Sequence, residues 1–63
     1  MFAIEYSAVG INGARDCDRE DGTFKTEKQA EKAMRAMDKR GVAGLFINGE
    51  AVATISRWVA EIA

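Results

Sequence analysis

The chain has no histidine and no proline, and it has only one cysteine. A single cysteine excludes an internal disulfide, and the absence of histidine removes the commonest general base and zinc ligand. The formal net charge of -1 excludes the strongly basic character typical of nucleic-acid binders. The N-terminal residues lack the basic flank of a signal peptide, and no apolar run is long enough to span a bilayer. We expect a soluble cytoplasmic protein without membrane contact.

What is present is an ordinary globular composition in a short chain. Of 63 residues, 48% are hydrophobic and 30% are charged, which excludes disorder on compositional grounds. No linker, repeat or low-complexity segment divides the sequence, so residues 1–63 are expected to form one domain. A chain of this size buries only about 60% of the surface that its unfolded form exposes. A binding partner would therefore add to its stability.

Residues 26–40 carry the signals of an amphipathic helix. Thr26 is a suitable N-cap, and Gln29 three residues later fits a capping box. Gly41 supplies the residue that often ends a helix in the left-handed conformation. Helical spacing places four apolar residues on one side, as expected for a face that packs on a core: Ala30, Ala33, Met34 and Met37.

Strand patterns flank this helix on both sides. Residues 2–9 alternate apolar and polar positions, and Asn12-Gly13 predicts a type I′ turn that returns residues 14–19 beside them. After the helix, residues 42–47 and 50–55 flank Asn48-Gly49, which predicts a second hairpin. The expected fold is α+β, a four-stranded antiparallel sheet with one helix in the order ββαββ.

The C-terminal segment is ambiguous by spacing alone. Ile55, Trp58, Val59 and Ile62 have the spacing of a helical face. An alternating set prolongs the strand instead, namely Val52, Thr54, Ser56 and Trp58. We expect the strand to end near Ser56 and a short helical turn to follow.

Strand alternation predicts a sheet with two apolar faces. One face would hold Val42, Phe46, Ala51 and Ile55, and the other would hold Leu45, Ile47 and Val52. A single helix covers one face only. The other must meet the C-terminal segment folded back as a lid, a second copy of the chain, or a different protein.

An acidic cluster is the first candidate for partner binding. It comprises Asp16, Asp18, Glu20 and Asp21, which could imitate phosphates in a basic groove, with Trp58 as an apolar anchor. Arg15 and Arg19 interrupt the cluster, so a charged edge strand that resists aggregation is the alternative. The same residues approach the spacing of a calcium loop, but Asp21 stands where that loop needs glycine. We expect no metal site and no cofactor.

A basic row on the helix is the alternative candidate, for nucleic-acid binding. Helical spacing aligns Lys28, Lys32, Arg35 and Lys39 opposite the apolar stripe. No aromatic residue is interleaved to stack a base, and acidic neighbours such as Glu31 can pair with the row. A solvated helix face is the favoured explanation of the row, so nucleic acid is the less favoured partner.

Catalysis is not expected. Cys17 has no histidine to activate its thiol, and a chain this short has little volume in which to enclose a substrate. A stretch around Phe46 has some likeness to the aromatic strand of RNA-recognition domains, but Val42 and Gly44 stand where aromatic residues are needed.

A resemblance adds to this interpretation. The pattern Phe24-x-Thr26, Ala30, Ala33, Gly41 and Ile47-Asn48-Gly49 makes residues 24–55 similar to small bacterial and phage ββαββ domains of unknown function. In size, α+β make-up and lack of catalytic residues, the whole chain resembles phage-encoded inhibitors, including anti-CRISPR proteins. This resemblance implies a protein that occupies a surface of a larger host complex.

The sequence thus predicts a non-enzymatic protein-binding module. Its most concrete version is a phage-type inhibitor that blocks a host nucleic-acid-handling complex sterically or electrostatically. The alternatives are a small nucleic-acid-binding protein and a structural homodimer.

Overall fold

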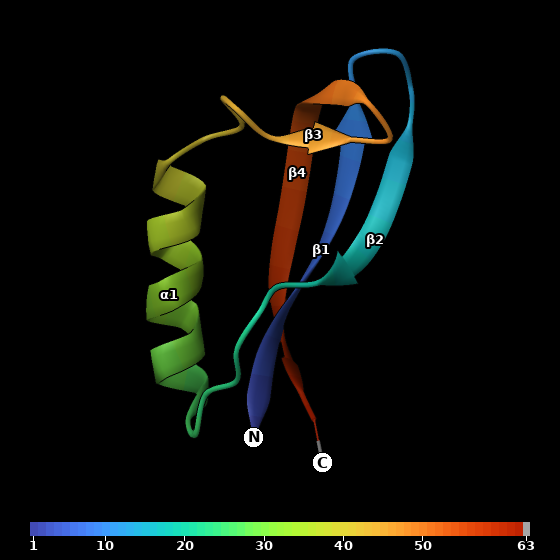
Figure 1. The fold of residues 1–63 in the computed structure, drawn as a ribbon. Helices are drawn as coiled ribbons and strands as arrows, with labels where there is room; N and C mark the ends of the chain where they lie inside the picture. Colours follow the sequence, from blue (N-terminus) through green and yellow to red (C-terminus); the bar gives the residue numbers. More distant parts are fainter. Residues whose placement is uncertain (63) are drawn as a thin grey trace.

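The computed structural model describes residues 1–62 and has the predicted α+β fold, with elements in the order ββαββ (Figure 1). These elements are β1 (Phe2–Gly10), β2 (Arg15–Arg19), α1 (Glu27–Lys39), β3 (Phe46–Ile47) and β4 (Glu50–Glu61). The strands form one antiparallel sheet in the order β2-β1-β4-β3. Figure 1 shows α1 on one side of this sheet, so the molecule has two layers.

The helix begins and ends where the sequence predicts. The Thr26 hydroxyl accepts a hydrogen bond from the Gln29 backbone N–H at 3.1 Å, which is one half of a capping box. Arg40 is the C-cap, and Gly41 follows with a φ of 69°. Within the helix, Ala30 is fully buried and Ala33, Met34 and Met37 are half-buried, so the predicted apolar stripe is the face that packs on the sheet.

The two predicted hairpin turns differ in conformation. Asn48 and Gly49 both have positive φ, 48° and 81°, as a type I′ turn requires. In the first hairpin only Gly13 has positive φ, so the turn predicted at Asn12-Gly13 is not of type I′. A longer loop closes there instead, through a 2.7 Å bond that the Gly10 N–H donates to the Ala14 carbonyl.

The C-terminal segment is a strand, and the helical turn expected after Ser56 is wrong. β4 continues to Glu61 because it pairs with the whole of β1, from Phe2 opposite Glu61 to Gly10 opposite Val52. This pairing supplies backbone partners to every second residue of the segment. The local sequence fits a helical and a strand spacing equally well, and the long-range pairing with β1 decides in favour of the strand.

The predicted division of apolar side chains between the two faces is wrong for Ile55. The pairing of β1 with β4 shifts register between Val9 and Gly10, where Thr54 and then Val52 are the partners. This bulge at Ala53 brings Val52 and Ile55 to the same face, the one that α1 covers. The predicted third strand is also shorter, because β3 contains only Phe46 and Ile47. The prediction that both faces of the sheet are apolar is therefore wrong, because the face away from α1 is mostly polar.

The core is thin for a folded protein. Among residues 1–62, five hydrophobic residues are buried, and three of them are alanines: Ala3, Ala8 and Ala30, with Ile4 and Val52. The accessible surface of residues 1–62 is close to 4425 Å², whereas a compact monomer of this mass is expected to expose about 4000 Å². In this part of the chain, no helix combines the length and the apolar character that crossing a bilayer requires.

Candidate docking surface

The face of the sheet that α1 leaves uncovered, here called the open face, is built from rows of residues across neighbouring strands. Strand register places Arg19, Glu5 and Trp58 in one row, from β2 through β1 to β4. The next row holds Cys17, Ser7 and Ser56. The row beyond holds Arg15, Val9 and Thr54, and Ala3 lies beside Ala60 at the other end. The face is thus flat and polar in its middle, with one large aromatic side chain.

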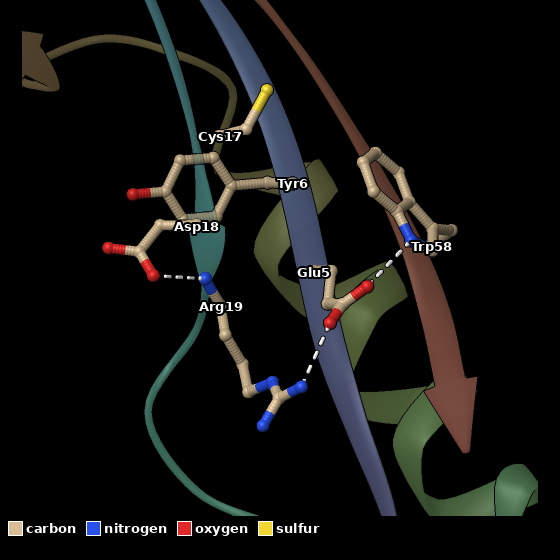
Figure 2. A pocket seen from close by; sticks show the side chains of 6 residues that line it. All are labelled: Glu5, Tyr6, Cys17, Asp18, Arg19 and Trp58. Atoms are coloured by element: carbon tan, nitrogen blue, oxygen red, sulfur yellow. Dashed lines mark hydrogen bonds and ion pairs between the residues drawn. The ribbon is translucent and has the colours of Figure 1, made fainter. Parts of the chain in front are cut away.

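Glu5 holds the two large side chains of its row. One carboxylate oxygen of Glu5 accepts a hydrogen bond from the Trp58 indole N–H at 3.2 Å. The other accepts from the Arg19 guanidinium at 3.0 Å. Figure 2 shows Glu5 between Arg19 and Trp58, with a dashed bond to each. One side chain on the central strand therefore fixes an aromatic ring and a cation on the strands to either side.

This bonding changes the titration of Glu5. The hydrogen bond from Arg19, and after it the bond from Trp58, lowers the pKa of the Glu5 carboxyl below its usual value. The carboxylate therefore stays ionised, and remains an acceptor for both donors, under mildly acidic conditions. Trp58 stays 43% exposed despite the bond.

A shallow hollow of about 540 Å³ lies around this row. Its lining residues, drawn in Figure 2, are Glu5, Tyr6, Cys17, Asp18, Arg19 and Trp58. The Cys17 thiol, which is exposed, donates a long bond of 3.5 Å to the Ser7 hydroxyl. The hollow is wide and open, a shape suited to a protruding side chain of a partner rather than to an enclosed small molecule.

The structure does not bring all the predicted partner-binding residues together. Asp16 and Asp18 pair with Ala8 and Tyr6, which places their side chains on the α1 side of β2. Trp58 belongs to the open face, although Asp18 also lines the hollow around it. Asp21 is exposed in the loop after β2.

Tyr6 lies beside this acidic strand. Its hydroxyl donates to the Asp16 carboxylate at 3.4 Å. Burial, followed by the negative charges of Asp16 and Asp18, raises the pKa of the Tyr6 hydroxyl above its usual value.

Glu20 has a structural partner, which the sequence did not reveal. The side chain of Arg57 is only 5% exposed and donates to Glu20 at 2.8 Å and to Asp38 at 2.7 Å. Burial by itself lowers the pKa of Arg57, but the bonds to Glu20 and Asp38 outweigh burial and raise it. Arg57 thus ties β4 to the end of α1 and to the loop after β2. Separations of 37 and 19 residues hide these pairs from any local pattern.

The basic row of the helix lies in solvent. Lys28, Lys32, Arg35 and Lys39 are all exposed. Arg35 lies 3.9 Å from Glu31, and an exposed ion pair of this kind contributes little to the free energy of unfolding. The row therefore has the placement expected of a solvated helix face, and nucleic-acid binding by it stays an untested prediction.

Within residues 1–62, no group of three or more histidine, cysteine or carboxylate side chains is arranged to hold a metal ion. Comparisons of the chain with protein-family models, with curated proteins and with solved structures found no match.

Proposed function

We propose that this chain is a non-enzymatic docking module that binds a larger protein through the open face of its sheet. The observation that carries the proposal is the row of Arg19, Glu5 and Trp58, in which a half-exposed indole is fixed by a hydrogen bond on a face without a covering helix. Tryptophan and arginine are the residues most enriched at the energetic centres of protein interfaces.

Fixing the indole before binding favours affinity. A long side chain that is immobilised only on binding loses about 0.5–1.5 kcal/mol of conformational entropy. Trp58 and Arg19 are already oriented by Glu5, so less of this cost remains. Around them the small side chains Ser7, Ser56 and Ala60 leave the sheet flat enough for close approach.

The partner class follows from the shape and polarity of this face. Around Glu5, the open face offers an aromatic ring, two guanidinium groups and several hydroxyls, which suits a protein surface with an apolar pocket and exposed carboxylates. A phage-type inhibitor of a host nucleic-acid-handling complex, anti-CRISPR-like in style, stays the most concrete version of the proposal. In that version the half-buried Asp16 and the exposed Asp18 and Asp21 would add negative charge at the rim, while Glu20 is occupied by Arg57.

Site-specific crosslinking tests the proposal. A photoreactive amino acid is placed at Ser56, which is exposed and one row from Trp58, or at Lys32 on the outer side of α1. Both proteins are incubated with lysate from the host cells. The proposal predicts a discrete crosslinked product from position 56 that is larger than two copies of this chain and is absent from position 32.

Trp58→Ala in the Ser56 crosslinking protein provides the control for specificity. The product must weaken with this substitution, and it must persist when Lys28 is changed to Ala on the far side of the molecule. A product that forms from position 32 and not from position 56 would refute docking by the open face.

A further inference from the structure

The outer edge of β4, on the side away from β1, is largely without a strand partner. β3 pairs only with Glu50 and Ala51, and the Val52 N–H donates to the Leu45 carbonyl at 3.0 Å. From Ala53 to Glu61, no further strand lies on this side among the described residues. The longest strand of the sheet is therefore paired along its full length on one side only.

The backbone groups at this edge can be identified from the register. The Ile62 N–H donates to the Met1 carbonyl, so even-numbered residues near the end of β4 point their backbone groups towards β1. On β1, the backbone groups of Phe2 and Ile4 point away from β4 and bond to the backbone of Phe24 and Glu20, in agreement with this assignment. The N–H and C=O groups that point outward are those of Ile55, Arg57, Val59 and Glu61.

This edge is accessible. An open hollow of about 470 Å³ lies beside residues 54–57 of β4 and is also lined by Asp38, Gly41 and Val42, at and after the end of α1. An additional strand would lie in this hollow with its backbone against β4.

The two edges of the sheet differ in protection. The exposed edge strand β2 has four charged residues among its five, a common means of preventing strand addition in monomeric proteins. Residues 53–60 of β4 contain one charged residue, Arg57, whose side chain is turned inward to Glu20 and Asp38. β4 therefore lacks the protection that β2 has, although its edge is longer.

We propose that β4 pairs along this edge, antiparallel and about a two-fold axis, with β4 of a second copy of this chain. The outward N–H of Val52 is already bonded to Leu45, so the second strand cannot extend along β4 as far as Val52. The longest register that avoids Leu45 places Trp58 opposite Trp58 of the second copy, Arg57 opposite Val59, and Ile55 opposite Glu61. The four outward residues of each copy then exchange about eight backbone hydrogen bonds.

A second copy fits because this register is self-complementary. No like charges stand opposite one another, and the two-fold pair is an aromatic pair in a non-hydrogen-bonded position, where side chains approach most closely. The two four-stranded sheets become one sheet whose open faces are continuous. The two Trp58 side chains meet at its centre. The excess surface of the single chain agrees with such an assembly.

Sedimentation velocity across a wide concentration range tests the pairing, together with amide hydrogen exchange on the same samples. The expected result is a concentration-dependent shift to twice the mass of one chain. In the dimer, the amides of Ile55, Arg57, Val59 and Glu61 become protected, whereas the dilute protein exchanges them rapidly.

Val59→Pro is the discriminating variant. Proline removes the N–H of residue 59, which points outward, and leaves the hydrogen bonds between β4 and β1 in place. Val59→Ala is its matched control, since it shortens the same side chain and keeps the N–H. The proposal expects the proline variant to stay monomeric with intact β1–β4 amide protection, and the alanine variant to dimerise. A wild-type chain that stays monomeric at all concentrations would overturn the proposal, as would a dimer whose four edge amides exchange rapidly.

Discussion

Arg57 on β4 and Asp38 near the end of α1 are joined by a 2.7 Å bond between Nη1 and Oδ1, the only direct ion pair between the helix and the sheet in residues 1–62. The same guanidinium binds Glu20 at 2.8 Å, with its Nε. The helix and two parts of the sheet layer are therefore connected by one nearly buried cation. Since only five hydrophobic residues are buried among residues 1–62, we expect this connection to contribute a large share of the helix attachment.

The first prediction concerns this cation. Arg57→Ala should lower the free energy of unfolding by about 2 kcal/mol, because it removes charge-assisted hydrogen bonds and the packed aliphatic stem. Arg57→Met retains the stem and should cost less. Urea unfolding followed by circular dichroism measures both. Equal stability of Arg57→Ala and the wild type would show that the helix is held by packing alone.

Removal of Asp38 should have a smaller effect. The Asp38 side chain is 50% exposed, so screening by solvent limits its contribution to about 1 kcal/mol or less. Arg57 keeps Glu20 as a partner in Asp38→Ala. A loss in this variant that exceeds the loss in Arg57→Ala would contradict the assignment of Arg57 as the centre of the network.

The second prediction concerns Gly10, which makes room for a carboxylate. Glu50 Oε1 accepts bonds from the Asn12 N–H at 2.9 Å and the Ala14 N–H at 3.0 Å, and a Cβ at Gly10 would overlap the Glu50 side chain. Gly10→Ala should therefore displace Glu50 and destabilise the protein by about 1–3 kcal/mol. Thermal unfolding provides the measurement. In a Glu50→Ala background the same change should cost much less, and equal costs in both backgrounds would disprove the steric explanation.

The third prediction is a pH dependence at Trp58. The pKa of Glu5 lies below its usual value of 4.5 in the folded protein, so the bonds to Trp58 and Arg19 contribute stability above that value. This contribution is lost as pH falls through the folded pKa. Trp58 is the only tryptophan, so its fluorescence should change with a midpoint below pH 4.5.

Arg19→Ala is the control for this titration, because the bond from Arg19 is the largest cause of the lowered pKa. The midpoint of the fluorescence change should move upward in this variant. An unchanged midpoint would mean that the fluorescence reports a group other than Glu5.

The fourth prediction concerns the start of the helix. Thr26→Ala removes the acceptor for the Gln29 N–H and should cost about 1 kcal/mol. Thr23→Ala, in the exposed loop before the helix, should have almost no effect. Thermal unfolding of the two variants compares them directly, and similar losses would argue against a capping role for Thr26.

The parts of the fold that the sequence predicted are those determined locally. The Thr26 cap, the Gly41 stop and the Asn48-Gly49 turn each depend on residues within one turn of chain, and each is present. The length of β4 was not predictable in this way, because Trp58 and Val59 fit two periodicities and pairing with Glu5 and Ile4 decides between them.

The face assignment failed for a related reason. A single bulged residue, Ala53, moves Ile55 to the other side of the sheet, and no sequence signal marks that bulge. The polar open face and its centre were missed as a result. The sequence alone predicts Trp58 as an anchor, whereas its partners Glu5 and Arg19 are identified only when the strand register places three strands side by side.

The measurement that tests the docking account most directly is the affinity of the crosslinked partner, once purified, for the wild type and two variants by isothermal titration calorimetry. The account predicts that Trp58→Ala weakens binding by about 2 kcal/mol or more, roughly thirtyfold, because the fixed indole is the anchor. The charge reversal Lys32→Glu with Arg35→Glu should leave affinity within about twofold, apart from a small long-range electrostatic effect. Full affinity in Trp58→Ala together with loss of binding in the helix variant would contradict the account.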